Sequence, residues 1–212
     1  MGLQFSITAI GSIMLQSANN ALGTACVAAF TAAMRIKMFV MCPLDALGMA
    51  MATYSGQNYG AGKPDRIWMG IKSATLMMVV YSVSIAIIMW GLADKFSLLF
   101  ISPDETEIME DTVLFLHINT SFFILLGSLS ILRYSIQGAG YTRLSMFSGV
   151  AEMIARALVS LVLVPVWKFW GVCFGDPTAW LFANFFLVPA FIYVYRQLKK
   201  MVATEERVPV NS

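Results

Sequence analysis

The stretch QNYGAGKPDR, residues Gln57–Arg66, joins two long apolar segments through a short turn. Gly60 and Gly62 permit the backbone conformations that end a helix, and Pro64 suits the first position of the next helix. The stretch lacks the GxxxxGK[ST] spacing of a phosphate-binding loop. We therefore interpret it as a helix-to-helix turn at a bilayer surface, with transmembrane helices on both sides.

The composition indicates a chain that is embedded in a membrane. Hydrophobic residues make up 58% of the chain and charged residues 12%, and the mean hydropathy is +0.74. A soluble domain usually carries about 25% charged residues. Met1–Met34, Ser73–Ala93 and Pro177–Tyr195 contain no charged side chain, and each is long enough to cross about 30 Å of hydrocarbon as a helix. The sequence predicts an all-α polytopic membrane protein.

Several functional classes are disfavoured. The net charge of +2 is too small and too scattered for a nucleic-acid-binding face. Cys26, Cys42 and Cys173 show no paired zinc-binding spacing, so we predict no metal site. One histidine and no paired carboxylates at membrane depth provide no catalytic group, so we predict no enzyme. The amino terminus has neither a basic region nor a small-residue cleavage site, so we expect no removable signal peptide.

The pattern of glycine, proline and charge predicts six transmembrane helices in one bundle over residues 1–198, followed by a cytoplasmic polar tail at 199–212. The second helix would be about 48 Å long at 1.5 Å per residue, so we expect it to tilt or to bend at Pro43. The predicted spans are 2–22, 25–55, 66–92, 110–136, 144–166 and 177–196.

Basic residues divide unequally between the two ends of the predicted bundle. Eight fall at one end, and only Lys95 and Lys168 fall at the other. The positive-inside rule then places the basic end and both termini in the cytoplasm, with the chain in the plasma membrane. Four tryptophans are expected to form an interfacial belt at the outer end. The eight basic residues are Lys63, Arg66, Lys72, Arg143, Arg196, Lys199, Lys200 and Arg207, and the four tryptophans are Trp90, Trp167, Trp170 and Trp180.

Six charged residues remain inside the predicted spans. Each costs about 2.5–3.5 kcal/mol at mid-bilayer and needs a partner or an aqueous cavity. Arg133 and Glu152 lie on consecutive antiparallel helices at comparable depth, so we predict that they pair. Arg156 lies one turn beyond Glu152, and the three would form a structural cluster that locks helices near the inner surface. The other three are Arg35, Lys37 and Asp45 on the second span, which either line a cavity or snorkel and lock helices.

The first predicted span carries four amide side chains in an otherwise apolar helix. Amides in hydrocarbon either form hydrogen bonds between helices or line a substrate path, and both interpretations stay open here. Together with Arg35 and Asp45 they make up the predicted substrate or ion path. The four amides are Gln4, Gln16, Asn19 and Asn20.

Several motifs resemble one transporter family. They are CPLDALG (Cys42–Gly48), GQNYGAGK (Gly56–Lys63), QGAGYTR (Gln137–Arg143), EMIAR (Glu152–Arg156) and GDPTAW (Gly175–Trp180). Through nearly its whole length, the chain resembles the carboxy-terminal half of a multidrug and toxic compound extrusion (MATE) transporter. The residues of the family turn motif are Pro43, Gly56, Gln57, Asn58, Gly60, Gly62 and Lys63.

The resemblance implies a twelve-helix exporter built from two six-helix bundles around a central cleft. It implies secondary active efflux of drugs or other cationic or amphipathic small molecules, in exchange for sodium or protons and without another cofactor. Alternating access around a central site needs both halves. We therefore expect membrane lipid and either a missing amino-terminal half or a second copy of the chain as partners, and we favour a fragment over a half-transporter. The alternatives are a lipid or oligosaccharide flippase, which would favour a strongly cationic groove, and a non-transporting accessory subunit.

One part of the family pattern is not matched. Some members carry acidic cation-site residues in the helices that correspond to the first and fourth spans. Here Met1–Ala21 has no acidic residue, and Gly127 and Ser128 stand near the corresponding place in the fourth span. If this half couples an ion, Asp45 or Glu152 must serve; otherwise the other half supplies the acid.

Overall fold

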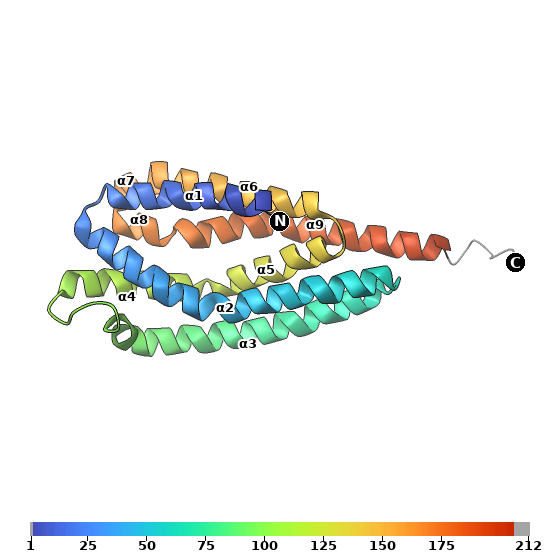
Figure 1. Cartoon of the computed structure of the whole chain (residues 1–212), viewed down its shortest axis with the longest axis horizontal. Helices are drawn as coiled ribbons and strands as arrows, with labels where there is room; N and C mark the ends of the chain where they lie inside the picture. Colours follow the sequence, from blue (N-terminus) through green and yellow to red (C-terminus); the bar gives the residue numbers. More distant parts are fainter. Residues whose placement is uncertain (1, 206–212) are drawn as a thin grey trace, which may run out of the picture.

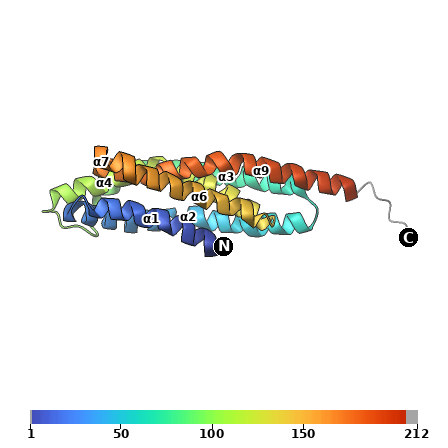
Figure 2. The ribbon, with the colours of Figure 1, turned by 90° about the horizontal axis from the view of Figure 1, so that it is seen from above.

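The computed structural model describes residues 2–205, and all its regular elements there are helices that run side by side in one elongated bundle (Figure 1). The first helices are α1 (Gly2–Asn20), α2 (Thr24–Gly60), α3 (Pro64–Ser97), α4 (Thr106–Ser121) and α5 (Phe123–Gly138). They are followed by α6 (Thr142–Leu158), the π-helical segment η1 (Val159–Leu163), α7 (Val164–Trp167), α8 (Phe169–Cys173) and α9 (Gly175–Glu205). α1 and the first part of α2 lie on one side of the bundle and α9 on the opposite side (Figure 2).

Five of the six predicted spans have the length and apolar composition of a membrane crossing. α2, α3, Thr142–Trp167 and Phe169–Ala203 qualify singly, and α4 with α5 qualifies as a bent pair. α1 forms the predicted helix but is not among them, since four of its 19 residues are amides. α9 runs past residue 198 to Glu205, and the rest of the predicted tail, including Arg207, lies outside the described residues.

Two predicted spans depart from single straight helices. The fourth, predicted as one helix over 110–136, is divided at Phe122 into α4 and α5, which are bent by 50°. The second is continuous, with Pro43 inside α2, and it changes direction about half-way along (Figure 1). Proline removes one hydrogen bond of the helix and clashes with the preceding turn, which accounts for the bend.

Both turns at the basic end of the bundle close in the same way. Gly62 has φ 65° and Gly140 has φ 88°, in the left-handed region that favours glycine. The amide of Lys63 donates to the carbonyl of Asn58 (2.9 Å), and the amide of Tyr141 donates to that of Ile136 (3.1 Å). Such bonds satisfy the last carbonyls of α2 and α5 and let each chain reverse within a few residues.

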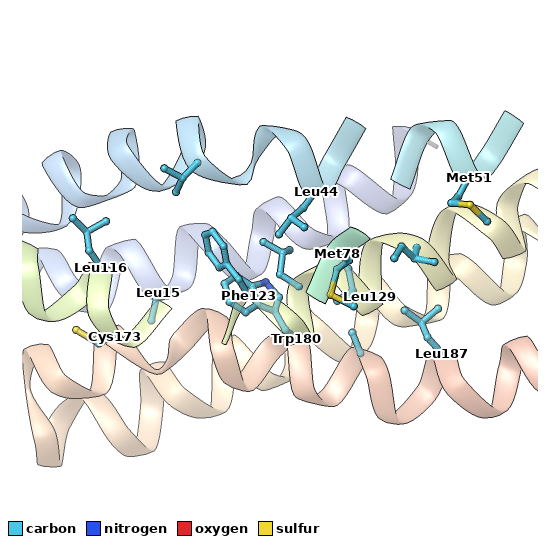
Figure 3. Packing of buried hydrophobic residues seen from close by; sticks show 14 of the residues in the cluster. Leu15, Leu44, Met51, Met78, Leu116, Phe123, Leu129, Cys173, Trp180 and Leu187 are labelled. Carbon is cyan, nitrogen blue, oxygen red and sulfur yellow. The ribbon is translucent and has the colours of Figure 1, made fainter. Parts of the chain in front are cut away.

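Buried apolar side chains pack around the break between α4 and α5 (Figure 3). Phe123 is fully buried beside Trp180, with ring centroids 6.1 Å apart, and both lie among leucines from neighbouring helices (Figure 3). The predicted interfacial position of Trp180 is therefore wrong, because only 4% of this residue is exposed. Trp90, Trp167 and Trp170 are exposed, as a belt requires.

Candidate functional site

A chain of buried charged side chains connects four of the long helices. Lys37 of α2 pairs with Asp176 of α9, Asp176 with Arg156 of α6, and Arg133 of α5 with Glu152 of α6. Arg156 also pairs with Glu152 along its own helix. Each of these side chains is at most 12% exposed. We call these five residues the charge network; it joins α2, α5, α6 and α9 through ion pairs.

Arg156 stands at the centre of the network. Its Nη2 lies 2.9 Å and its Nε 3.0 Å from Oδ1 of Asp176, and its Nη1 lies 3.3 Å from Oε2 of Glu152. A guanidinium group presents several donors in one plane, which suits it to bridging two carboxylates. Each carboxylate also binds a second cation, so the pairs form one continuous path from α2 to α5.

Asp45 lies close to the Arg133 end of this path. Arg133 Nε donates to Ser148 Oγ at 3.1 Å, and its guanidinium group interacts electrostatically with Asp45. Asp45 is half-buried and also lies near Tyr134. The structure shows no hydrogen bond or ion pair from its carboxylate to another residue in the range 2–205. Asp45 is thus a carboxylate beside the network whose oxygen atoms have no protein donor there.

Lys37 ends the path on the other side. Its ammonium group lies 5.3 Å from the ring centroid of Phe115 and 6.0 Å from that of Trp180. The ring faces and Asp176 replace the water that a buried ammonium group loses. Lys37 was predicted either to line a cavity or to snorkel and lock helices together. Its ion pair with Asp176 joins α2 to α9, which is the helix-locking arrangement.

A second polar cluster ties α1 to the bundle. The Gln137 side-chain amide donates to the Gln4 carbonyl and to Ser145 Oγ, and Ser145 Oγ also donates to Gln4 at 3.0 Å. All three side chains are buried. Gln4 therefore forms hydrogen bonds from α1 to α5 and α6, as a polar side chain between packed helices does.

Arg156 lies on the long helix that α6, η1 and α7 form together over Thr142–Trp167. Arg156 is 14 residues from the start of α6 and 11 from Trp167, or about 21 Å and about 16 Å along the helix. It is therefore near the middle of this helix. The π-helical segment η1 begins three residues later, and Ser160 within it donates to the Arg156 carbonyl at 2.7 Å. π-Helical turns inside α-helices occur frequently at functional sites.

Within residues 2–205, no side-chain hydrogen bond or ion pair joins the predicted path residues to one another. The predicted Arg133–Glu152 pair is present. Gln16, Asn20 and Arg35 are exposed on the bundle surface, and between described residues no side-chain hydrogen bond or ion pair connects them to the network. Asn19 is buried and donates to the Cys26 carbonyl at 3.3 Å, which holds the α1–α2 turn.

Sequence reasoning missed one residue of the charge network, Asp176, and one residue of the polar cluster at Gln4, Gln137. Asp176 falls in a predicted loop, yet it lies in the first turn of α9 and is buried. The signal that could have found it is an aspartate directly before Pro177 at the start of a charge-free span. Gln137 was assigned to a turn, but it lies inside α5.

Comparison with known proteins gives a consistent result. A family model described as MatE matches residues 1–162. A crystal structure of MATE in complex with MaL6 superposes with a TM-score of 0.85 at 20% identity, over 93% of this chain and 45% of the other. The outward-facing conformation of a multidrug resistance MATE family transporter superposes with a TM-score of 0.82 at 12% identity, over 92% of this chain and 43% of the other. No curated protein matches the sequence.

One further structure differs in its description. A MOP superfamily transporter from Pyrococcus furiosus, described as having a binding pocket of reverse polarity that suggests a different function, gives a TM-score of 0.72 at 18% identity. The match covers 97% of this chain and 45% of that one. At these identities the structures show the fold alone. The chain spans less than half the length of the transporters it matches.

Proposed function

Because the chain belongs to the MatE family, we propose that it forms one half of a secondary active efflux transporter. The assembled transporter exports drugs or other cationic or amphipathic small molecules in exchange for sodium or protons. In this proposal the chain lies in the plasma membrane with its basic end and both termini in the cytoplasm. Its partner is a second six-helix half, either an amino-terminal half or another copy of the chain.

The observation that carries this proposal is the position of Asp45. A carboxylate at membrane depth with no protein donor is costly unless it is protonated or binds a cation. A proton, a sodium ion or a cationic substrate would each satisfy it. Asp45 interacts with Arg133, and Arg133 is ion-paired to α6, so a change in the charge of Asp45 acts directly on a contact between two helices.

The exposed polar residues on α1 and α2 support the partner half. Gln16 and Asn20 are exposed on α1, and Arg35 is exposed on α2. Arginine on a transmembrane helix usually faces protein or a water-filled cavity rather than lipid. A second bundle packed against α1 and α2 would provide both a protein surface and a water-filled cleft. Arg35 and the two amides would then line the cleft between the two bundles.

Replacing Asp45 tests the proposed role. In the chain assembled with a second half, Asp45→Asn should abolish most gradient-driven export of a cationic dye such as ethidium, because it removes the charge while keeping the shape. The matched control is Asp94→Asn, since Asp94 is an exposed aspartate in the last turn of α3. The assay is dye fluorescence in cells that carry equal amounts of each variant. Export and ion coupling equal to those of the control would refute the role of Asp45.

The flippase alternative receives less support from the charges. It predicts a strongly cationic groove that would hold anionic headgroups. The charge network and its neighbour instead contain three cations (Lys37, Arg133 and Arg156) and three carboxylates (Asp45, Glu152 and Asp176). This balance favours a site that exchanges one cation for another.

A further inference from the structure

A groove lies at the basic end of the bundle, where the α2–α3 turn meets the end of α9. Its inner compartment has a volume of about 270 Å³ and mostly apolar walls from three helices. Ile67 and Leu198 form its buried base, and Met201 and Val202 form one wall. The compartment is large enough to hold a glycerol backbone or the first methylenes of an acyl chain rather than a single water molecule.

A charged compartment adjoins the apolar one. It has a volume of about 440 Å³, shares Lys63 and Val202 with the first, and adds Asp65, Arg66 and Lys199. Asp65 is already engaged, because Lys199 lies 2.9 Å from its carboxylate and the Tyr195 hydroxyl donates to it at 2.9 Å. Lys63 and Arg66 are exposed, and neither side chain has a hydrogen bond or an ion pair to another residue of the described chain. Two cations therefore face the groove with no carboxylate to balance them in the described part of the chain.

Aromatic residues place this groove at the level of lipid headgroups. Trp68 is partly exposed on α3 and stacks on Phe191 of α9, with ring centroids 6.2 Å apart. The Lys72 ammonium group reaches back toward the helix start and lies 5.7 Å from the Trp68 ring centroid. Tryptophan and snorkelling lysine mark the membrane–water boundary. Pro64 starts α3 four residues before Trp68, about 6 Å further out, which is the depth of phosphate groups.

We infer that this groove binds one anionic glycerophospholipid from the leaflet at the basic end of the bundle. The lipid phosphate lies between Lys63 and Arg66, and its glycerol ester region lies over Ile67 and Leu198. Basic pockets between transmembrane helices recognise anionic headgroups through such charges. The site holds the α2–α3 turn against α9, far along the chain from the charge network. The inference is independent of the proposed transport function.

Retention of lipid by the purified chain tests this inference. The full chain is incubated in detergent with equal amounts of phosphatidylglycerol and phosphatidylcholine, and bound lipid is counted by native mass spectrometry. We expect one phosphatidylglycerol molecule to be retained preferentially. Lys63→Gln with Arg66→Gln should weaken its retention about thirtyfold, since each basic group near a membrane surface contributes about fivefold. Arg143→Gln is the matched control, because it removes an exposed cation from the start of α6 at the same end of the bundle, and this variant should retain lipid like the unaltered chain.

A second variant keeps the charges and fills the apolar compartment. Val202→Trp should also abolish preferential retention, which separates the site from general attraction of anionic lipid. Three results would overturn the inference. One is equal retention by the double variant and Arg143→Gln. Another is competition by soluble glycerol phosphate as strong as that by phosphatidylglycerol. The third is binding that appears only after removal of residues 206–212, which would make that segment the occupant.

Discussion

Each acidic residue of the charge network binds two cations, and this sets the relative importance of its members. Lys37 with Asp176 and Arg133 with Glu152 form two one-to-one pairs, and Arg156 is the third cation, which bridges them. Removing Asp176 or Glu152 leaves two buried cations without their carboxylate. Removing Arg156 leaves two neutral pairs, Lys37 with Asp176 and Arg133 with Glu152. Breaking a buried pair from one side is costly because the remaining charge is uncompensated.

Glu152→Gln should therefore destabilise the bundle more than Arg156→Leu. We expect Glu152→Gln to lower the free energy of unfolding by about 3–5 kcal/mol, because it leaves Arg133 and Arg156 without their shared carboxylate. Arg156→Leu removes two ion pairs with their hydrogen bonds, but it leaves Asp176 paired with Lys37 and Glu152 paired with Arg133, so it should cost only about 1–3 kcal/mol. The measurement is unfolding by SDS in mixed micelles, followed by helical circular dichroism. A larger loss for Arg156→Leu would contradict this division of roles.

Exchanging the charges of Arg133 and Glu152 tests their pairing. Arg133→Glu and Glu152→Arg should each prevent folding or greatly reduce the folded yield, because each places like charges together in the core. The double variant restores the pair, but it places a second cation beside Arg156, so we expect partial recovery. Folded yield in membranes is the readout. A double variant with no more folded protein than either single variant would show that the pair is not formed.

At the scale of helices, α2 and α5 approach each other through glycines. A Cβ atom at Gly138 would meet the backbone of Ala52, and one at Gly56 would lie 3.1 Å from the Gly138 carbonyl oxygen. A backbone cannot give way as a flexible side chain can, so these positions fix the distance between the two helices. The same two helices carry Asp45 and Arg133, whose separation therefore depends on this contact.

Gly138→Ala should push α2 and α5 apart and cost about 1–3 kcal/mol. Gly60→Ala is the matched control, since each glycine is the last residue of its helix and a Cβ at Gly60 would meet nothing within 4 Å. The control should be neutral or stabilising by up to about 1 kcal/mol. SDS unfolding of both variants checks the difference. Equal stability of the two variants would mean that the close approach is not required.

For the molecule as a whole, the sequence predicts the helices, which follow from the length of the apolar runs. It also predicts contacts between helices that are joined by a short turn. The helical bundle and five membrane-length spans follow from long apolar runs with few charges, and the Arg133–Glu152 pair follows from two helices joined by a short turn. Lys37 and Asp176 are 139 residues apart, and nothing local connects them. The break at Phe122 lies in an apolar stretch without proline or glycine beside it, so tertiary packing around Phe123 decides it.

In the proposed function, this bundle works as half of a gradient-driven exporter. The most direct test of this function is ethidium movement across proteoliposomes that contain the chain assembled with a second six-helix half, under an imposed sodium or proton gradient. The account predicts movement that requires both halves and stops when an ionophore collapses the gradient of the coupling ion. No movement under either gradient, or movement that continues unchanged after both gradients are collapsed, would contradict it.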